Sequence, residues 1–525
     1  MKHFIFAAVL LCAASAIGAA PVKTLDGLVE GTVEDGIDVY RGIPFAAPPV
    51  GNLRWRAPQP VKKWPAVRAA NEFAASCMQP TRASTLTASA LTVSEDCLYL
   101  NVWSPAKSAD AKLPVMVWIY GGGFMAGSTA IPLYSGEQLA KKGVVVVSVA
   151  YRVGPMGFFA HPALSAESEH HVSGNYGLLD QIAGLRWVQQ NIAAFGGDPR
   201  RVTIFGESAG AISVSMLAVS PLAKGLFSGA ISESGGSFGP PRSPGEPGEN
   251  VQPLAAAEQD GVAYATKMEA RSASDLRKLS AEAVASGAGA ALGLSWPVLD
   301  GWVIPDDQYK RYAAGQYNDT PILIGTNSDE GALFPMPPTR DAYVEGVRRR
   351  YGPFADAILK HYPPAEQGWL QSSRDLMRDV GFGWHTWVWA RLQSKAGKSK
   401  VFYYYFDHAP PRTEDSRFKH AAGAVHAEEM VYVFQHLDQQ PLPWTAEDRA
   451  ISEAMATYWT NFAKHGDPNG EGVPQWPAYS EASGAVMHFN AKPEVGKVAN
   501  LAKIEALDKY FRWRRTDEGA KLGMK

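Results

Sequence analysis

Two kinds of hydrophobic pattern alternate along the first half of the chain. Residues 115–120 and 144–149 are nearly continuous apolar runs, which are typical of strands covered on both faces of a parallel sheet. Between residues 175 and 195, apolar side chains recur at spacings of three and four, which predicts a helix. Residues 202–205 predict the next strand, and a helical pattern begins at Ala209. This alternation predicts an α/β fold with a large, mostly parallel central sheet flanked by helices.

The second half of the chain continues this pattern and adds longer helical stretches. Further strands are expected at residues 230–232, 321–324 and 401–405. The stretches 254–292 and 340–392 look helical, and we expect them to form cap insertions beside the sheet rather than an independent domain. On this interpretation residues 21–525 make up a single domain.

The first twenty residues predict a signal peptide. Lys2 supplies positive charge, residues 4–11 are apolar, and residues 13–20 are mostly small, as a cleavage site requires. The apolar run is shorter than the ~20 residues that a membrane-spanning helix needs, and no later stretch predicts a span. The alternative is a buried first helix. We therefore expect a secreted or periplasmic protein.

Composition and charge narrow the function. The 525 residues include 50 Lys and Arg against 52 Asp and Glu, a formal net charge of -2. This balance gives no electrostatic footprint for nucleic acid or for an anionic membrane. Without the leader, two cysteines remain, Cys77 and Cys97, and they can pair in an oxidising compartment; the alternative is two buried thiols. No spacing typical of a metal site or a phosphate-binding loop occurs, so we expect no metal and no cofactor.

The strongest chemical signal is the segment 206–210, which reads Gly-Glu-Ser-Ala-Gly. In a nucleophile elbow a serine lies on a sharp turn between a strand and a helix, and small residues must flank it. The motif alone is weakly specific. Here it follows a predicted strand and precedes a predicted helix, and this context favours Ser208 as a nucleophile over a structural turn serine.

A serine nucleophile needs hydrogen-bond donors for the negative charge that develops on the substrate oxygen. Three consecutive glycines, at positions 121–123, follow a predicted core strand. Glycines allow backbone N–H groups to turn inward without a clash at Cβ. We therefore predict an oxyanion hole formed by the N–H groups of Gly122, Gly123 and Ala209; the alternative is a flexible glycine turn.

The base and its orienting acid are harder to find, because spacing alone does not locate them. In α/β-hydrolases the chain order is serine, then Asp or Glu, then histidine. Asp329 and Glu330 follow a predicted strand, and nothing local separates them. Eight histidines come later: His361, His385, His408, His420, His426, His436, His465 and His488. His426 stands out because it lies in a loop that enters a helix, which suits a side chain directed into a cleft.

Two stretches resemble the type-B carboxylesterase/lipase family, the group that includes cholinesterases and bacterial para-nitrobenzyl esterases. Residues 95–105 read EDCLYLNVWSP, and residues 195–210 contain FGGDP and VTIFGESAG. Weaker agreement runs from residues 40–45 to residues 459–468, so the resemblance covers nearly the whole mature chain.

The resemblance implies an α/β-hydrolase fold and hydrolysis of a small-molecule carboxylic ester through an acyl-enzyme, without a cofactor. It implies Glu330 as the acid and His426 as the base, with the hydroxyl of Ser234 close to both. It also implies a disulfide between Cys77 and Cys97.

Departures from the family pattern bear on the substrate. Cholinesterases carry a tryptophan inside the first disulfide loop, where it stacks on the choline cation. The corresponding residues 78–96 contain no aromatic residue, which argues against a choline ester. We expect an apolar acyl side. The side chains predicted to line the substrate pocket are Phe124, Glu207, Leu292, Leu294, Trp296 and Trp384. For Trp384 the alternative is an aromatic side chain that packs between helices.

Two alternatives to a carboxylesterase remain. Lipase or amidase activity would use the same three side chains. A non-catalytic binding homologue typically lacks the nucleophile or the base, so the retention of Ser208, Glu330 and His426 together argues against that function.

Overall fold

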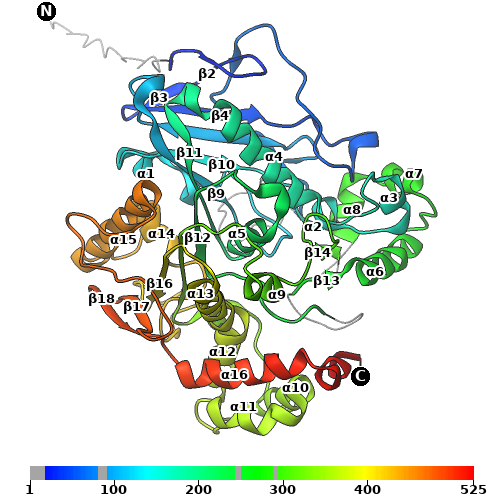
Figure 1. Cartoon of the computed structure of the whole chain (residues 1–525), viewed down its shortest axis with the longest axis vertical. Coiled ribbons are helices and arrows are strands. Elements are labelled where there is room, and N and C mark those ends of the chain that lie inside the picture. Colours follow the sequence, from blue (N-terminus) through cyan, green and yellow to red (C-terminus); the bar gives the residue numbers. More distant parts are fainter. Residues whose placement is uncertain (1–17, 81–90, 243–249, 288–293, 525) are drawn as a thin grey trace, which may run out of the picture.

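A computed structural model describes residues 18–80, 91–242, 250–287 and 294–524. Within these residues the central sheet has eleven strands (Figure 1). In spatial order they are β18 (Pro493–Lys497), β17 (Ala485–Phe489), β16 (Val401–Phe406), β15 (Ile322–Asn327), β12 (Gly229–Glu233), β11 (Gly197–Glu207), β9 (Leu113–Ile119), β10 (Val145–Val149), β8 (Tyr99–Ser104), β4 (Ile37–Pro44) and β3 (Thr32–Glu34). The seven strands from β17 to β10 run parallel to one another. The strand pairs at the two edges, β17 with β18 on one side and β10, β8, β4 and β3 on the other, are antiparallel. The predicted α/β class and mostly parallel sheet are thus confirmed.

The central strands owe their apolar sequences to burial on both faces. Every residue of β10 is buried, and so are residues 114–119 of β9. Helices cover both sides, as a parallel sheet requires. On one side α4 (Tyr176–Asn191) packs against α5 (Ala209–Val219), and on the other α15 (Ala446–His465) contacts β9 and β11 (Figure 1).

The two helical stretches expected as insertions contain most of the remaining helices. Residues 254–287 carry α6 (Leu254–Lys267), α7 (Ala273–Lys278) and α8 (Ala281–Gly287), while residues 288–292 of that stretch lie outside the described chain. The second stretch carries α10 (Arg340–Tyr351), α11 (Ala355–His361), α12 (Trp369–Arg378) and α13 (Trp384–Ala396). In Figure 1, α10, α11 and α12 lie with α16 (Leu501–Arg514) at one end of the molecule.

The region of the predicted signal peptide is described only from Gly18 onward. Gly18 bridges to Thr32, and the backbone N–H of Ala19 donates to the carbonyl oxygen of Gly31 at 3.1 Å. No helix in the described ranges is long and apolar enough to cross a membrane. A disulfide joins Cys77 and Cys97, as the family resemblance implied.

The topology gathers the candidate chemistry at one edge of the sheet. Ser208 follows β11, Ser234 follows β12, Glu330 follows β15, and the glycines at 121–123 follow β9. These strands are parallel neighbours, so their carboxyl ends lie together, which is where open α/β sheets bind ligands.

Candidate active site

The turn that carries Ser208 has a backbone that few residues tolerate. Ser208 has φ 55° and ψ -123°, a conformation that is costly for a residue with a side chain. A Cβ added at Gly206 would lie 2.6 Å from the carbonyl oxygen of Ile119, and one at Gly210 would lie 2.0 Å from the same atom. The N–H of Ser208 donates to the carbonyl oxygen of Glu233 at 2.9 Å. The glycines are therefore required for the close packing of β11, β9 and α5.

His426 connects the serine to a carboxylate. Its Nε2 lies 2.8 Å from Ser208 Oγ, and its Nδ1 lies 2.5 Å from Glu330 Oε2. The three residues come from distant parts of the chain, and His426 reaches the turn from the loop before α14 (Met430–Val433). This geometry allows a proton to pass from the serine hydroxyl to the imidazole while the carboxylate orients the ring.

Glu330 is held rigidly. It is fully buried, and its Oε1 accepts hydrogen bonds from Ser234 Oγ at 2.6 Å and from the N–H of Asn327 at 2.7 Å. These contacts leave Oε2 directed at His426. Ser234 therefore lies where the resemblance implied.

Asp329, the other acid that the sequence left open, has a different partner. Its Oδ2 accepts from the N–H of Ala422 at 2.7 Å, and its own N–H donates to the carbonyl oxygen of Ala424 at 2.7 Å. Asp329 thus fastens the loop that carries His426, whereas Glu330 contacts the imidazole itself.

The predicted oxyanion donors face the same space as Ser208. Gly122 and Gly123 adopt φ values of 108° and 63°, which favour glycine. The N–H groups of Gly122, Gly123 and Ala209 form no hydrogen bond to any described residue. All three residues line one cavity together with Ser208 and His426. The arrangement can accept a negatively charged oxygen next to the serine hydroxyl.

This cavity has a volume of about 550 Å³. Its apolar lining consists mainly of Ile212, Trp296, Leu333, Phe334, Phe382, Val431, Leu442 and Trp444, and the loop of residues 410–413 and 415–418 forms a further part of the wall. This loop brings the polar side chains of Arg412, Thr413, Asp415, Ser416 and Arg417 to the wall, so the cavity has an apolar part and a polar part.

The expectations for the substrate pocket hold only in part. Glu207 and Trp296 line the cavity, and Phe124 lies behind Trp296, with ring centroids 5.0 Å apart. Leu292 lies outside the described residues. Leu294 was expected in the pocket, but it packs in a separate apolar cluster with Tyr264 and Leu276.

Trp384 also does not line the cavity. Its ring lies 4.0 Å from that of Phe511, and its Nε1 donates to Asp508 Oδ1 at 3.3 Å. Its position at the start of α13 turns it toward α16, so the aromatic side chain serves helix packing.

Comparison with known proteins identifies the family of this chain. A model of the carboxylesterase family matches residues 19–507. This chain belongs to the carboxylesterase family. The family match supports hydrolysis of a small-molecule ester.

Individual relatives agree with this assignment. A fumonisin B1 esterase from Sphingopyxis macrogoltabida is 36% identical over 508 residues, which cover 92% of this chain and 88% of the relative. A para-nitrobenzyl esterase from Bacillus subtilis (strain 168) is 38% identical over 476 residues, covering 88% and 92%. The solved structure of a thermophilic PNB esterase superimposes with a TM-score of 0.81 at 33% identity, covering 93% of this chain and 99% of that one. The predicted α/β-hydrolase fold is thereby confirmed.

Beneath the serine, this carboxylesterase buries further carboxyl groups. Burial raises the pKa of Glu207 to about 7, and its Oε1 lies 3.2 Å from His426 Nε2. Burial likewise raises the pKa of Glu233 to about 8, although Trp459 Nε1 donates to its Oε1 at 2.9 Å. The pKa of Glu429 is raised well above its ordinary value, again chiefly by burial. At neutral pH Glu233 is therefore largely protonated, and burial likewise favours the neutral form of Glu429, which limits the negative charge around the imidazole.

Several residues of the site carried no signal in the sequence. Glu233, Glu429 and Asn327 reach the site because their strands and loops converge, and Phe334 and Phe382 approach the imidazole from separate helical segments. No motif links them, so only the folded arrangement reveals them. Among the described residues, no group of three or more His, Cys, Asp and Glu side chains could hold a metal ion.

Proposed function

We propose that this protein hydrolyses carboxylic esters by acyl transfer through Ser208, with His426 as the general base and Glu330 as its orienting acid. The observation that carries the proposal is the position of the His426 imidazole, with Nε2 2.8 Å from Ser208 Oγ and Nδ1 2.5 Å from Glu330 Oε2.

In the first half of the reaction His426 Nε2 takes the proton of Ser208, and the serine oxygen attacks the ester carbonyl. The N–H groups of Gly122, Gly123 and Ala209 stabilise the resulting oxyanion. The imidazolium then gives its proton to the leaving alcohol, which departs and leaves an acyl-serine. In the second half His426 takes a proton from water while the water oxygen attacks the acyl carbon. The bond between the acyl carbon and Ser208 Oγ then breaks, which releases the acid, and the imidazolium returns its proton to Ser208 Oγ.

The substrate class follows from the cavity. Its volume of about 550 Å³ and its aromatic and aliphatic lining suit an ester with a bulky apolar part. The absence of aromatic residues at positions 78–96 continues to argue against choline esters.

Export from the cytoplasm is also part of the proposal. Two observations support it: the signal-peptide pattern of residues 1–20 and the Cys77–Cys97 disulfide, because disulfides persist in oxidising compartments.

The test of the chemistry is Ser208→Ala, assayed on p-nitrophenyl butyrate. We expect turnover to fall at least about 10³-fold, because the nucleophile is lost while only binding and the oxyanion donors remain. The matched control is Ser108→Ala, a change at an exposed serine before β9, which should retain full activity. Substantial hydrolysis by a folded Ser208→Ala protein would overturn the proposal.

A further inference from the structure

An aromatic ring covers the imidazole of His426. The ring centroid of Phe382 lies 4.6 Å from that of His426, with an angle of 30° between the planes. Phe334 lies farther away, at 5.4 Å and 50°. The Phe382 geometry is close to offset stacking, the arrangement in which an aromatic face attracts a neighbouring ring or cation.

Phe382 owes its position to an irregular turn. Residues Asp379–Gly383 form one turn of π-helix between α12 and α13. Such turns are rare and are found frequently at functional sites. They change the direction in which a helix presents its side chains. Here the change directs Phe382 into the large cavity that Ser208 and His426 also line.

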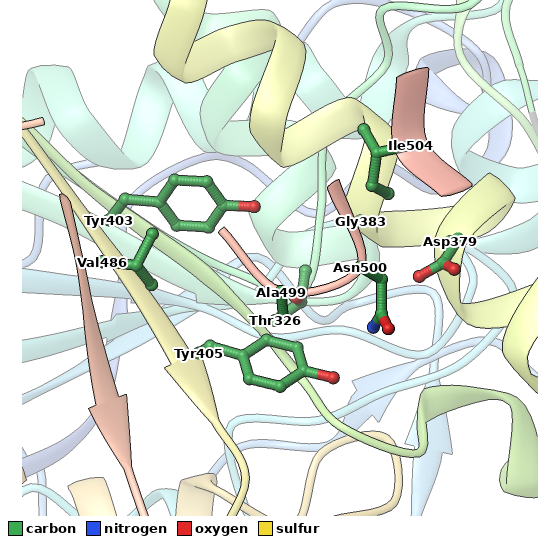
Figure 2. A pocket seen from close by; sticks show the side chains of 9 residues that line it. All are labelled: Thr326, Asp379, Gly383, Tyr403, Tyr405, Val486, Ala499, Asn500 and Ile504. Carbon is green, nitrogen blue, oxygen red and sulfur yellow. The ribbon is translucent and has the colours of Figure 1, made fainter. Parts of the chain in front are cut away.

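The far side of this π-helical turn is firmly anchored. Arg378 Nε donates to Asp379 Oδ1 at 2.7 Å, and Tyr362 OH donates to Asp379 Oδ2 at 2.9 Å. Figure 2 shows Asp379 and Gly383 next to Ile504 of α16, around a second cavity of only about 10 Å³. Phe382 lines the large cavity and not this small one, so the π-helical turn lies between the two cavities. The hydrogen bonds of Asp379 fix the turn on the side away from Phe382.

We propose that Phe382 is a positioning residue, whose ring holds the His426 imidazole in line between Ser208 and Glu330 and stabilises the imidazolium formed during acyl transfer. The proposal rests on the proposed function. The proton that leaves Ser208 Oγ binds Nε2 of His426, while the Nδ1 proton stays directed at Glu330. The imidazole then carries one positive charge beside the aromatic face of Phe382. A cation over an aromatic face is stabilised relative to the neutral ring.

Other groups also act on the charge of His426. Glu330 and Glu207 face it from the β15 and β11 turns, and Glu428 and Glu429 lie on its own loop. Near the π-helical turn, Arg378 pairs with both Asp379 and Asp375, and Lys503 pairs with Asp375. A change at Phe382 that preserves apolar bulk therefore alters the aromatic contact without changing the number of charges.

Phe382→Leu is that change. We expect kcat for p-nitrophenyl butyrate to fall by about two- to thirty-fold, with KM much less affected, because the lost contact is strongest in the charged state. Loss of the ring should also lower the pKa of the imidazole. The acid limb of the kcat/KM profile should then move to lower pH by about half a unit to one unit. Phe382→Tyr, which keeps the ring, should restore both values.

Two controls separate this role from general damage. Phe354→Leu removes a ring that packs on Tyr510 and Trp513, away from His426, and should leave kcat and the acid limb unchanged. Titration of active sites with an organophosphate corrects kcat for any misfolded fraction and shows independently whether Ser208 reacts. If Phe382→Leu retained the wild-type kcat, or lost activity without any movement of the acid limb, the proposal would be overturned while the nucleophile assignment stood.

Discussion

Glu207 and Glu233 are direct neighbours on the parallel strands β11 and β12, and both are buried at the turn that carries Ser208. In a parallel pair such neighbours project on the same face of the sheet, so two carboxyl groups share one desolvated region. This explains why the carboxylesterase keeps protons on these groups at a pH at which ordinary glutamates have lost them.

The pairing predicts a pH-dependent stability. Burial raises the pKa of Glu233 from 4.5 to about 8, so between these values the folded protein binds a proton that the unfolded chain has released. The free energy of unfolding therefore falls as pH rises through this range. Glu233→Gln keeps the acceptor for Trp459 Nε1 and does not titrate, so this variant should gain stability over the wild type between pH 5 and pH 9. The gain should be a few kcal/mol, since one pKa unit corresponds to about 1.4 kcal/mol.

Urea denaturation at several pH values measures this difference. Glu345→Gln, at an exposed position on α10, is the control and should show no pH-dependent gain. Parallel pH curves for the wild type and Glu233→Gln would contradict the prediction.

A second prediction concerns the two adjacent acids. Glu330→Gln should lower kcat by about 10³- to 10⁴-fold, because an amide no longer orients and stabilises the charged imidazole. Asp329→Asn should act mainly on stability, since it weakens the hydrogen bond that the carboxylate accepts from the Ala422 N–H and that helps to fasten the His426 loop, at a cost of about 1–3 kcal/mol. Kinetics and thermal melts of both variants check this. The opposite pattern, with catalysis lost in Asp329→Asn and kept in Glu330→Gln, would exchange their roles.

A third prediction concerns the disulfide. The bond between Cys77 and Cys97 closes a loop of 20 positions, and its removal should lower the free energy of unfolding by about 3 kcal/mol on the chain-entropy model. The double variant Cys77→Ala/Cys97→Ala should unfold at lower urea concentration, and reductant should shift only the wild type. A wild-type midpoint that is insensitive to reductant would refute this, and a thiol count of the denatured protein checks the pairing directly.

The sequence revealed those parts of the site whose geometry is local. Ser208 was predictable because a turn between a strand and a helix requires small residues within a few positions. Gly122 and Gly123 were predictable because consecutive glycines allow backbone N–H groups to turn inward without a clash at Cβ. His426 and Glu330 are 96 positions apart. The loop that enters a helix favoured His426 among eight histidines, but only the family resemblance assigned it as the base and separated Glu330 from Asp329.

The errors have physical causes. Trp384 and Leu294 are apolar residues near the expected pocket, but Trp384 is buried against Phe511, and Leu294 lies in a separate apolar cluster. The sequence alone does not reveal whether such a side chain faces the cavity or a neighbouring helix. Phe382 was missed for the converse reason, since one π-helical turn changes its direction by an amount that a regular helical pattern does not anticipate.

The most direct test of the central claim is covalent. We predict that a diethyl phosphate ester with a p-nitrophenol leaving group adds one diethylphosphoryl group per chain, located by peptide mass spectrometry on Ser208, and that His426→Asn slows this labelling by orders of magnitude. Labelling at another residue, or equally fast labelling without the imidazole, would contradict the account.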